Sequence, residues 1–154
     1  MSVFSNWAGR VAFAVGAACS LFGAAAHSAT ADSADLTVDI SGFKSTKGHA
    51  IAKLYKDGEN VLGKPSLLIK TAIHGGKASV SFAGLKPGPY AVVVFQDLND
   101  NGEIDHNLFG LPAEPLGFSN GFSPGIVAGM PSFPKLRFEL GPKDKTISIT
   151  VHTL

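Results

Sequence analysis

Apolar and polar side chains alternate with a period of two along most of the chain beyond residue 35, and this alternation limits the possible folds more than any other feature. Leu36, Val38 and Ile40, for example, are separated by the polar Thr37 and Asp39. Successive side chains of a β-strand point to opposite faces, so a period of two is typical of strands with one solvated face. The pattern therefore predicts strands rather than helices.

Seven segments are expected to form strands. Tyr90–Phe95 is apolar throughout, which is typical of a central strand that is covered on both faces. The other strands are expected at residues 36–41, 49–55, 67–73, 78–82, 136–140 and 147–152. Turn-forming residues separate them, as in Lys86-Pro87-Gly88-Pro89. Seven short strands without a long helical stripe predict an all-β fold, an antiparallel two-sheet sandwich.

The N-terminal segment has the pattern of an export signal. Arg10 is its only charged residue, an apolar stretch follows from Val11 to Ala26, and Ala29-Thr30-Ala31 is a small-x-small cleavage site. We therefore expect a signal peptide at residues 1–31 and one β-sandwich domain at residues 32–154, located in the periplasm or outside the cell. Cleavage after Ala26 and retention of the segment as a membrane anchor are the alternatives.

Composition excludes several classes of partner. The chain has 13 Lys and Arg and 12 Asp and Glu, so the domain without Arg10 has 12 of each (13 − 1) and no net charge. It also has no basic run, and we expect no nucleic-acid partner and no stable membrane insertion after cleavage. The only cysteine, Cys19, lies in the expected leader, so the domain depends on its apolar core rather than on disulfides.

The segment Asp97–Pro134 shows no strand pattern, although it is rich in apolar residues. Loops of this length in compact domains are usually functional or disordered, and the apolar content argues against disorder. We expect the segment to be one long ordered loop that folds over one end of the sandwich. Its apolar residues are Phe109, Leu111, Leu116, Phe118, Phe122, Ile126, Val127, Met130 and Phe133.

The segment begins with a run of Asp and Asn residues that has the spacing of a calcium-binding loop. Oxygen-bearing side chains occupy positions one, three, five and nine, a glycine stands at position six, and the main-chain carbonyl of position seven adds a ligand. These residues are Asp97, Asn99, Asn101, Asp105, Gly102 and Glu103, in that order. Position twelve is Leu108 instead of a bidentate Glu, so we expect weak affinity, in the roughly 10⁻⁴ to 10⁻³ M range of extracellular modules.

A metal-free turn is the alternative interpretation of this loop. Asp and Asn side chains bind their own main chain in turns, and Asn101-Gly102 is a strong hairpin signal. The density of carboxylates favours a cation, because four of them between residues 97 and 105 repel one another. Glu114 could return to the loop as the missing carboxylate or be solvated, and His106 could be a ligand or an ordinary surface histidine.

Longer motifs resemble known families. Residues 82–97 resemble the turn and strand shared by transthyretin-like and collagen-adhesin B-type repeat sandwiches, and with the run to Asp105 they resemble the calcium-binding adhesin repeats. With Gly110–Asn120 and Gly129–Phe133 added, residues 36–151 resemble a family of small exported bacterial proteins catalogued only as a domain of unknown function. The resemblance implies a secreted immunoglobulin/transthyretin-like sandwich without an established activity. The adhesin repeats carry Glu or Asp where this chain has Leu108.

Motifs for nucleophilic catalysis are not found in the sequence of the expected domain, which has no cysteine and no Gly-x-Ser-x-Gly elbow. We therefore expect a non-catalytic exported binding or structural module, in which Ca²⁺ orders the long loop for an unknown protein, glycan or small ligand. The alternatives are an envelope or carbohydrate-active enzyme with two separated carboxylates, and a small-ligand carrier with an apolar pocket. Phe109, Phe118, Phe122 and Phe133 are either contact aromatics or core residues of the loop.

Overall fold

The computed structural model describes residues 33–125 and 127–153, so the expected signal peptide lies outside the described residues. The strands are β1 (Ala34–Ser41), β2 (His49–Lys56), β3 (Leu67–Thr71), β4 (Lys77–Leu85), β5 (Gly88–Asp97), β6 (Leu116–Phe118), β7 (Phe138–Leu140) and β8 (Lys145–Thr150). A 3-10 turn, η1 (Ser119–Gly121), and one short helix, α1 (Phe133–Leu136), complete the elements. In the described part of the chain, no helix has the length and hydropathy needed to cross a membrane.

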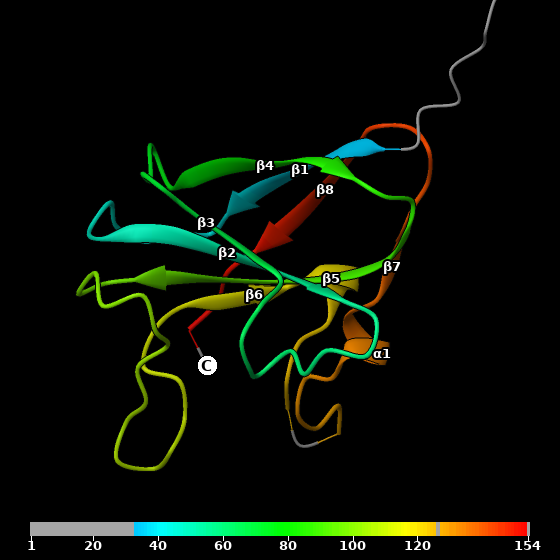
Figure 1. Cartoon of the computed structure of the whole chain (residues 1–154). Helices are drawn as coiled ribbons and strands as arrows, with labels where there is room; N and C mark the ends of the chain where they lie inside the picture. The colour runs from blue at the N-terminus through cyan, green and yellow to red at the C-terminus, as the bar shows by residue number, and fades with distance from the viewer. Residues whose placement is uncertain (1–32, 126, 154) are drawn as a thin grey trace, which may run out of the picture.

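Two sheets pack together, which confirms the all-β class and the two-sheet arrangement (Figure 1). The smaller sheet has the order β4-β1-β8, and the larger has the order β3-β2-β5-β6, with β7 also pairing with β5. The expectation of purely antiparallel pairing was wrong, because β1 and β8 run parallel, with Leu36 opposite Lys145 and Ser41 opposite Thr150. Alternation specifies which face a side chain occupies, but not the direction in which a neighbouring strand runs.

The core between the sheets follows the period-two pattern. On β1, Leu36, Val38 and Ile40 are buried, while Asp35 and Asp39 are exposed. The buried β1 residues belong to one apolar cluster with residues of both sheets. The other members of this cluster include Ala50, Ala52, Leu54, Val80, Phe82, Tyr90, Val92, Val94 and Ile149. β5 is buried from Tyr90 to Asp97, as its continuous apolar run predicts.

The long segment after β5 covers the outer face of the larger sheet, rather than one end of the sandwich. A second apolar cluster joins Ile51, Tyr55, Ala91, Val93 and Phe95 of that sheet to Val61, Leu116, Phe118, Phe133 and Leu136. β6 lies in this segment, where no strand was expected, and pairs with β5 through Val94 and Gly117. Leu136 lies in α1 and not in a strand, since Pro134 fits the first turn of a helix.

Candidate functional site

The acidic loop begins at the end of β5, where Asp97 is fully buried. Its two carboxylate oxygens accept hydrogen bonds from the main-chain N–H groups of Asn101 (3.1 Å) and Gly102 (2.9 Å). Gly102 has φ 80° and Asp100 has φ 63°, so the chain turns through two left-handed residues here. The Asp97 carboxylate therefore closes the turn and attaches the loop to the end of the central strand β5.

The side chains of Asn99, Asn101 and Asp105 meet on this turn. The amide groups of Asn99 and Asn101 donate to the two carboxylate oxygens of Asp105, at 2.7 and 2.9 Å. The amide oxygens of the same two residues accept the N–H groups of Asn101 (3.2 Å) and Glu103 (2.8 Å). Two amide donors thus offset part of the charge of Asp105.

Glu114 returns to the loop, and the interpretation that it is solvated was wrong. It is only 2% exposed. Its carboxylate accepts the N–H groups of Leu98 (2.7 Å) and Asp105 (3.4 Å). Burial raises the pKa of Glu114, the two main-chain hydrogen bonds oppose this shift, and the charges of Asp105 and Asp97 add to it. A third carboxylate is therefore held beside Asp97 and Asp105 against electrostatic repulsion.

Gly48 and Gln96 support the loop, and neither was predicted from the sequence. Gly48 has φ 67°, and a Cβ atom there would lie 1.8 Å from the main-chain oxygen of Asp97. The side-chain amide of buried Gln96 donates to the main-chain oxygens of Ser45 (3.2 Å) and Lys47 (2.8 Å). The segment before β2 is therefore fixed against the start of the acidic loop. A glycine directly before a strand was the only sequence signal of this contact.

Asp100 pairs with two side chains outside the loop, those of Lys70 and His49. It contacts Nζ of Lys70 at 2.9 Å and Nδ1 of His49 at 2.5 Å. The hydrogen bond from Lys70, followed by the one from His49, lowers the pKa of Asp100. His49 lies at the start of β2 and therefore tethers the loop to that strand.

The structure brings together four of the five predicted metal-loop residues through their side chains: Asp97, Asn99, Asn101 and Asp105. The side chain of Glu103 is exposed, and only its main chain takes part in the turn. Leu108 at position twelve is fully exposed, and His106 is exposed as well. Among the residues that the structure describes, no group of three or more His, Cys, Asp or Glu side chains has the geometry of a metal site. The converging groups are mixed carboxylates and amides.

Oxygen donors of this kind suit Ca²⁺, which takes carboxylate, amide and main-chain oxygens. The chemistry of the donor set therefore fits the cation. The orientation of the two amides does not yet fit, since their nitrogen atoms and not their oxygens face Asp105. Rotation of both amides would present the oxygens, at the cost of their bonds to the main chain.

The aromatic residues divide into two groups. Phe118 and Phe133 are buried in the outer apolar cluster, and half-buried Phe122 packs edge-on against Phe118 with ring centroids 5.5 Å apart. These three pack in the core of the segment. Phe109 is 88% exposed and is the one of the four that can contact another molecule directly.

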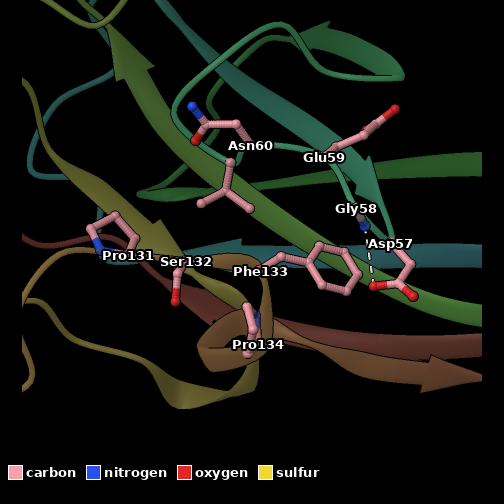
Figure 2. Close-up of a pocket in the computed structure, with 9 residues that line it drawn as sticks. Asp57, Gly58, Glu59, Asn60, Pro131, Ser132, Phe133 and Pro134 are labelled. Carbon is pink, nitrogen blue, oxygen red and sulfur yellow. Dashed lines mark hydrogen bonds between the residues drawn. The ribbon is translucent and has the colours of Figure 1, made fainter.

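An open hollow of about 340 Å³ lies between residues 57–61 and 131–134 (Figure 2). Asp57 on its wall accepts the N–H of Gly58 at 3.1 Å. Glu59, also on the wall, accepts hydrogen bonds from the Ser66 hydroxyl (2.6 Å) and the Lys56 N–H (2.9 Å). The Ser66 hydrogen bond is the main cause that lowers the pKa of Glu59. This carboxyl is therefore unlike the raised-pKa acid that glycoside hydrolysis requires.

A family model described as an uncharacterised protein conserved in bacteria, DUF2141, matches residues 38–148. The match covers β2 to β7, the second half of β1, most of β8 and the whole acidic loop. Searches of curated proteins and of solved structures returned no match.

Proposed function

The chain belongs to the DUF2141 family of bacterial proteins, and we propose that it is a non-catalytic exported binding module whose acidic loop is stabilised by Ca²⁺. The observation that carries the proposal is the buried carboxylate of Glu114, which folds back onto the loop beside Asp97 and Asp105. The sandwich would be of the immunoglobulin/transthyretin-like kind, modified by the parallel β1 and β8 pair.

Electrostatics favours a cation at this place. Three carboxylates share one short loop, and burial together with the charges of Asp105 and Asp97 raises the pKa of Glu114. Like charges in such a site destabilise one another, and a bound dication converts the repulsion into attraction. Lys70 and His49 contact Asp100 and none of these three carboxylates.

The loop residues would hold the ion with oxygen atoms only. Asp97, Asp105 and Glu114 would supply carboxylate oxygens, and Asn99 and Asn101 would supply amide oxygens after their amides rotate. The main-chain carbonyl of Glu103 would take position seven. Leu108 lies outside this set, and Glu114 takes the place of the carboxylate that a complete site has at position twelve. Binding would reach an affinity of roughly 10⁻⁴ to 10⁻³ M, typical of extracellular modules.

Calcium in this module would order a surface rather than catalyse a reaction. The loop connects the central strand β5 to β6 and to the segment that covers the outer face of the larger sheet. A cation there would fix the start of that segment and therefore the loops that follow it. The expected partner is a protein, a glycan, a small ligand or another component of the cell envelope, in the periplasm or outside the cell.

Calcium titration of the protein stripped of metal by a chelator tests the proposal. Isothermal titration should give one site per chain in the affinity range above. Glu114→Gln should weaken binding by about tenfold or more, since the carboxylate charge is lost while the oxygen that accepts the Leu98 N–H is kept. Glu139→Gln on β7 is the matched control, because that side chain is exposed and lies outside the loop, and it should bind Ca²⁺ like the wild type. Absence of calcium uptake by the wild type at millimolar concentration would overturn the proposal.

A further inference from the structure

The most exposed large apolar side chains lie on three loops. They are Leu62 on the loop between β2 and β3, Leu108, Phe109 and Leu111 after the acidic loop, and Val127 and Met130 before α1. Leu108 and Val127 are fully exposed, and Phe109 is 88% exposed. All three loops project on the side of the larger sheet that faces away from the smaller sheet (Figure 1). Leu108, Phe109 and Leu111 stand together on one turn, and such a concentration of exposed apolar side chains is unusual for a surface without a partner.

The turn at residues 107–111 and the loop at residues 127–130 carry no formal charge of their own, although Lys135 Nζ donates to Ala128 O (2.6 Å) and Met130 O (2.9 Å) of the second loop. The Leu62 loop is charged, since it contains Asp57, Glu59 and Lys64. Between residues 106 and 134, Glu114 is the only Asp, Glu, Lys or Arg, and it is buried. Solvated loops of soluble proteins usually carry charged residues. Depletion of charge together with exposed Leu, Phe and Met is typical of a surface that leaves water when it binds its partner.

The turn at residues 107–111 satisfies most of its own main-chain donors. The side-chain oxygen of Asn107 accepts the N–H groups of Phe109 (2.9 Å) and Leu111 (3.1 Å). Gly110 N–H donates to Asn107 O at 2.9 Å, and Asn107 N–H donates to Leu111 O at 2.8 Å. Main-chain groups without a partner are strongly unfavourable in hydrocarbon, so internal hydrogen bonding lowers the cost of moving this turn out of water.

The shape of the tips favours a lipid bilayer over a folded protein as the partner. Leu108 is fully exposed and Phe109 is 88% exposed, and neither lines the hollow beside residues 131–134 or the one beside residues 150–153. A folded protein partner would need a separate matching pocket for each tip. The acyl and headgroup boundary of a bilayer accepts separate convex apolar groups without such a match.

We propose that the protein docks reversibly on a lipid bilayer by inserting Leu108, Phe109 and Leu111 into the membrane interface, with the Val127 and Met130 loop as a second contact. This inference rests on the proposed function, because it names the partner of the surface that the acidic loop orders. The carboxylates of that loop directly precede the turn, so Ca²⁺ there would also reduce repulsion from anionic headgroups. Docking of this kind is peripheral and spans no bilayer.

Co-sedimentation with sucrose-loaded vesicles tests the proposal, using phosphatidylcholine alone and a mixture with phosphatidylglycerol, each in Ca²⁺ and in chelator. The wild type should sediment with both kinds of vesicle in Ca²⁺. Each lost apolar side chain should weaken partitioning by about tenfold, so Leu108→Ser/Phe109→Ser/Leu111→Ser should weaken it by more than about a hundredfold. The matched control is Leu67→Ser/Leu68→Ser on β3, at residues 43% and 46% exposed, which should bind vesicles like the wild type.

A spectroscopic variant reports where the tip lies. Trp7, the only tryptophan, belongs to the expected leader, so Phe109→Trp provides a single reporter in the processed domain. Its emission should shift to shorter wavelength when vesicles are added, because the ring leaves water. An unchanged emission spectrum at vesicle concentrations that sediment the protein would overturn the insertion.

The remaining outcomes separate this inference from the calcium proposal. Equal vesicle binding in Ca²⁺ and in chelator, with no calcium uptake by titration, would support lipid docking and overturn the calcium loop. Calcium uptake without sedimentation of the wild type on either kind of vesicle would overturn lipid docking alone. If the wild type is a dimer in solution and the triple substitution dissociates it, the tips contact a second copy of the chain and the proposal is overturned. The proposal is also overturned if the triple variant is folded and binds vesicles like the wild type.

Discussion

At the scale of single residues, the acidic loop depends on carboxylates that accept main-chain N–H groups. Asp97 holds the turn at Asn101 and Gly102, and Glu114 holds it at Leu98 and Asp105. Both carboxylates are buried, so their negative charge cannot be screened well by water. The hydrogen bonds that order the loop thus hold buried negative charges close together, and a bound cation would reduce the repulsion between them.

The raised pKa of Glu114 gives a pH dependence of defined sign. The folded state holds the Glu114 proton more tightly than the unfolded state, so the stability from this group is fully present below its ordinary pKa of 4.5. It is lost as the pH rises through the raised pKa of the folded state. In chelator, the stability of the wild type relative to Glu114→Gln should therefore fall as the pH rises above 4.5. Urea unfolding of both proteins across this range measures the difference.

Calcium should reverse this trend, because the ion competes with the proton for the same carboxylate. The stabilisation by Ca²⁺ should therefore shrink as the pH falls below the folded-state pKa of Glu114. Glu139→Gln is the control and should follow the wild type at every pH. A difference between wild type and Glu114→Gln that does not change with pH would contradict the assignment of the shift to Glu114.

At the scale of the elements, a few buried or partly buried polar side chains attach the irregular segments to the strands. The hydroxyl of Ser119 accepts the N–H of Val92 (2.9 Å) and donates to Leu136 O (2.6 Å), which joins β5, η1 and α1. The hydroxyl of Tyr55 donates to Gly63 O at 3.1 Å, and burial raises its pKa to about 12. The loops over the outer face of the larger sheet are therefore held to its strands by these hydrogen bonds as well as by apolar packing.

Ser119→Ala should destabilise the domain by about 2 to 6 kcal/mol, because it leaves one buried N–H and one buried carbonyl without a partner, each costing about 1 to 3 kcal/mol. Guanidinium unfolding measures this loss. Ser123→Ala lies on the same segment at an exposed position and should change stability by less than about 0.5 kcal/mol. Equal stability of the two variants would show that Ser119 does not join these elements.

At the scale of the whole molecule, local patterns predicted the strands and their buried faces, because alternation and turn residues act over a few positions. The run Tyr90–Phe95 predicted a doubly covered strand, and the cover on its outer face comes from residues 116–136. The parallel pairing of β1 with β8, the short strand β6 and the contact of Gly48 with Asp97 arise between distant segments, so no local pattern encodes them. In the loop, spacing identified Asp97, Asn99, Asn101 and Asp105, but only the fold brings Glu114 to them.

The central claim is that this loop binds Ca²⁺ and stabilises the fold, and thermal melting in chelator and in millimolar Ca²⁺ tests it most directly. A ligand that binds only the native state adds about 2.7 kcal/mol at a hundredfold excess over its dissociation constant, and this gain falls with the logarithm of the excess. We predict that the wild type melts several degrees higher in Ca²⁺ than in chelator, that Mg²⁺ restores less, and that Glu114→Gln loses most of the response. Identical melting curves of the wild type in chelator and in Ca²⁺ would contradict the claim and leave a metal-free Asx-rich turn.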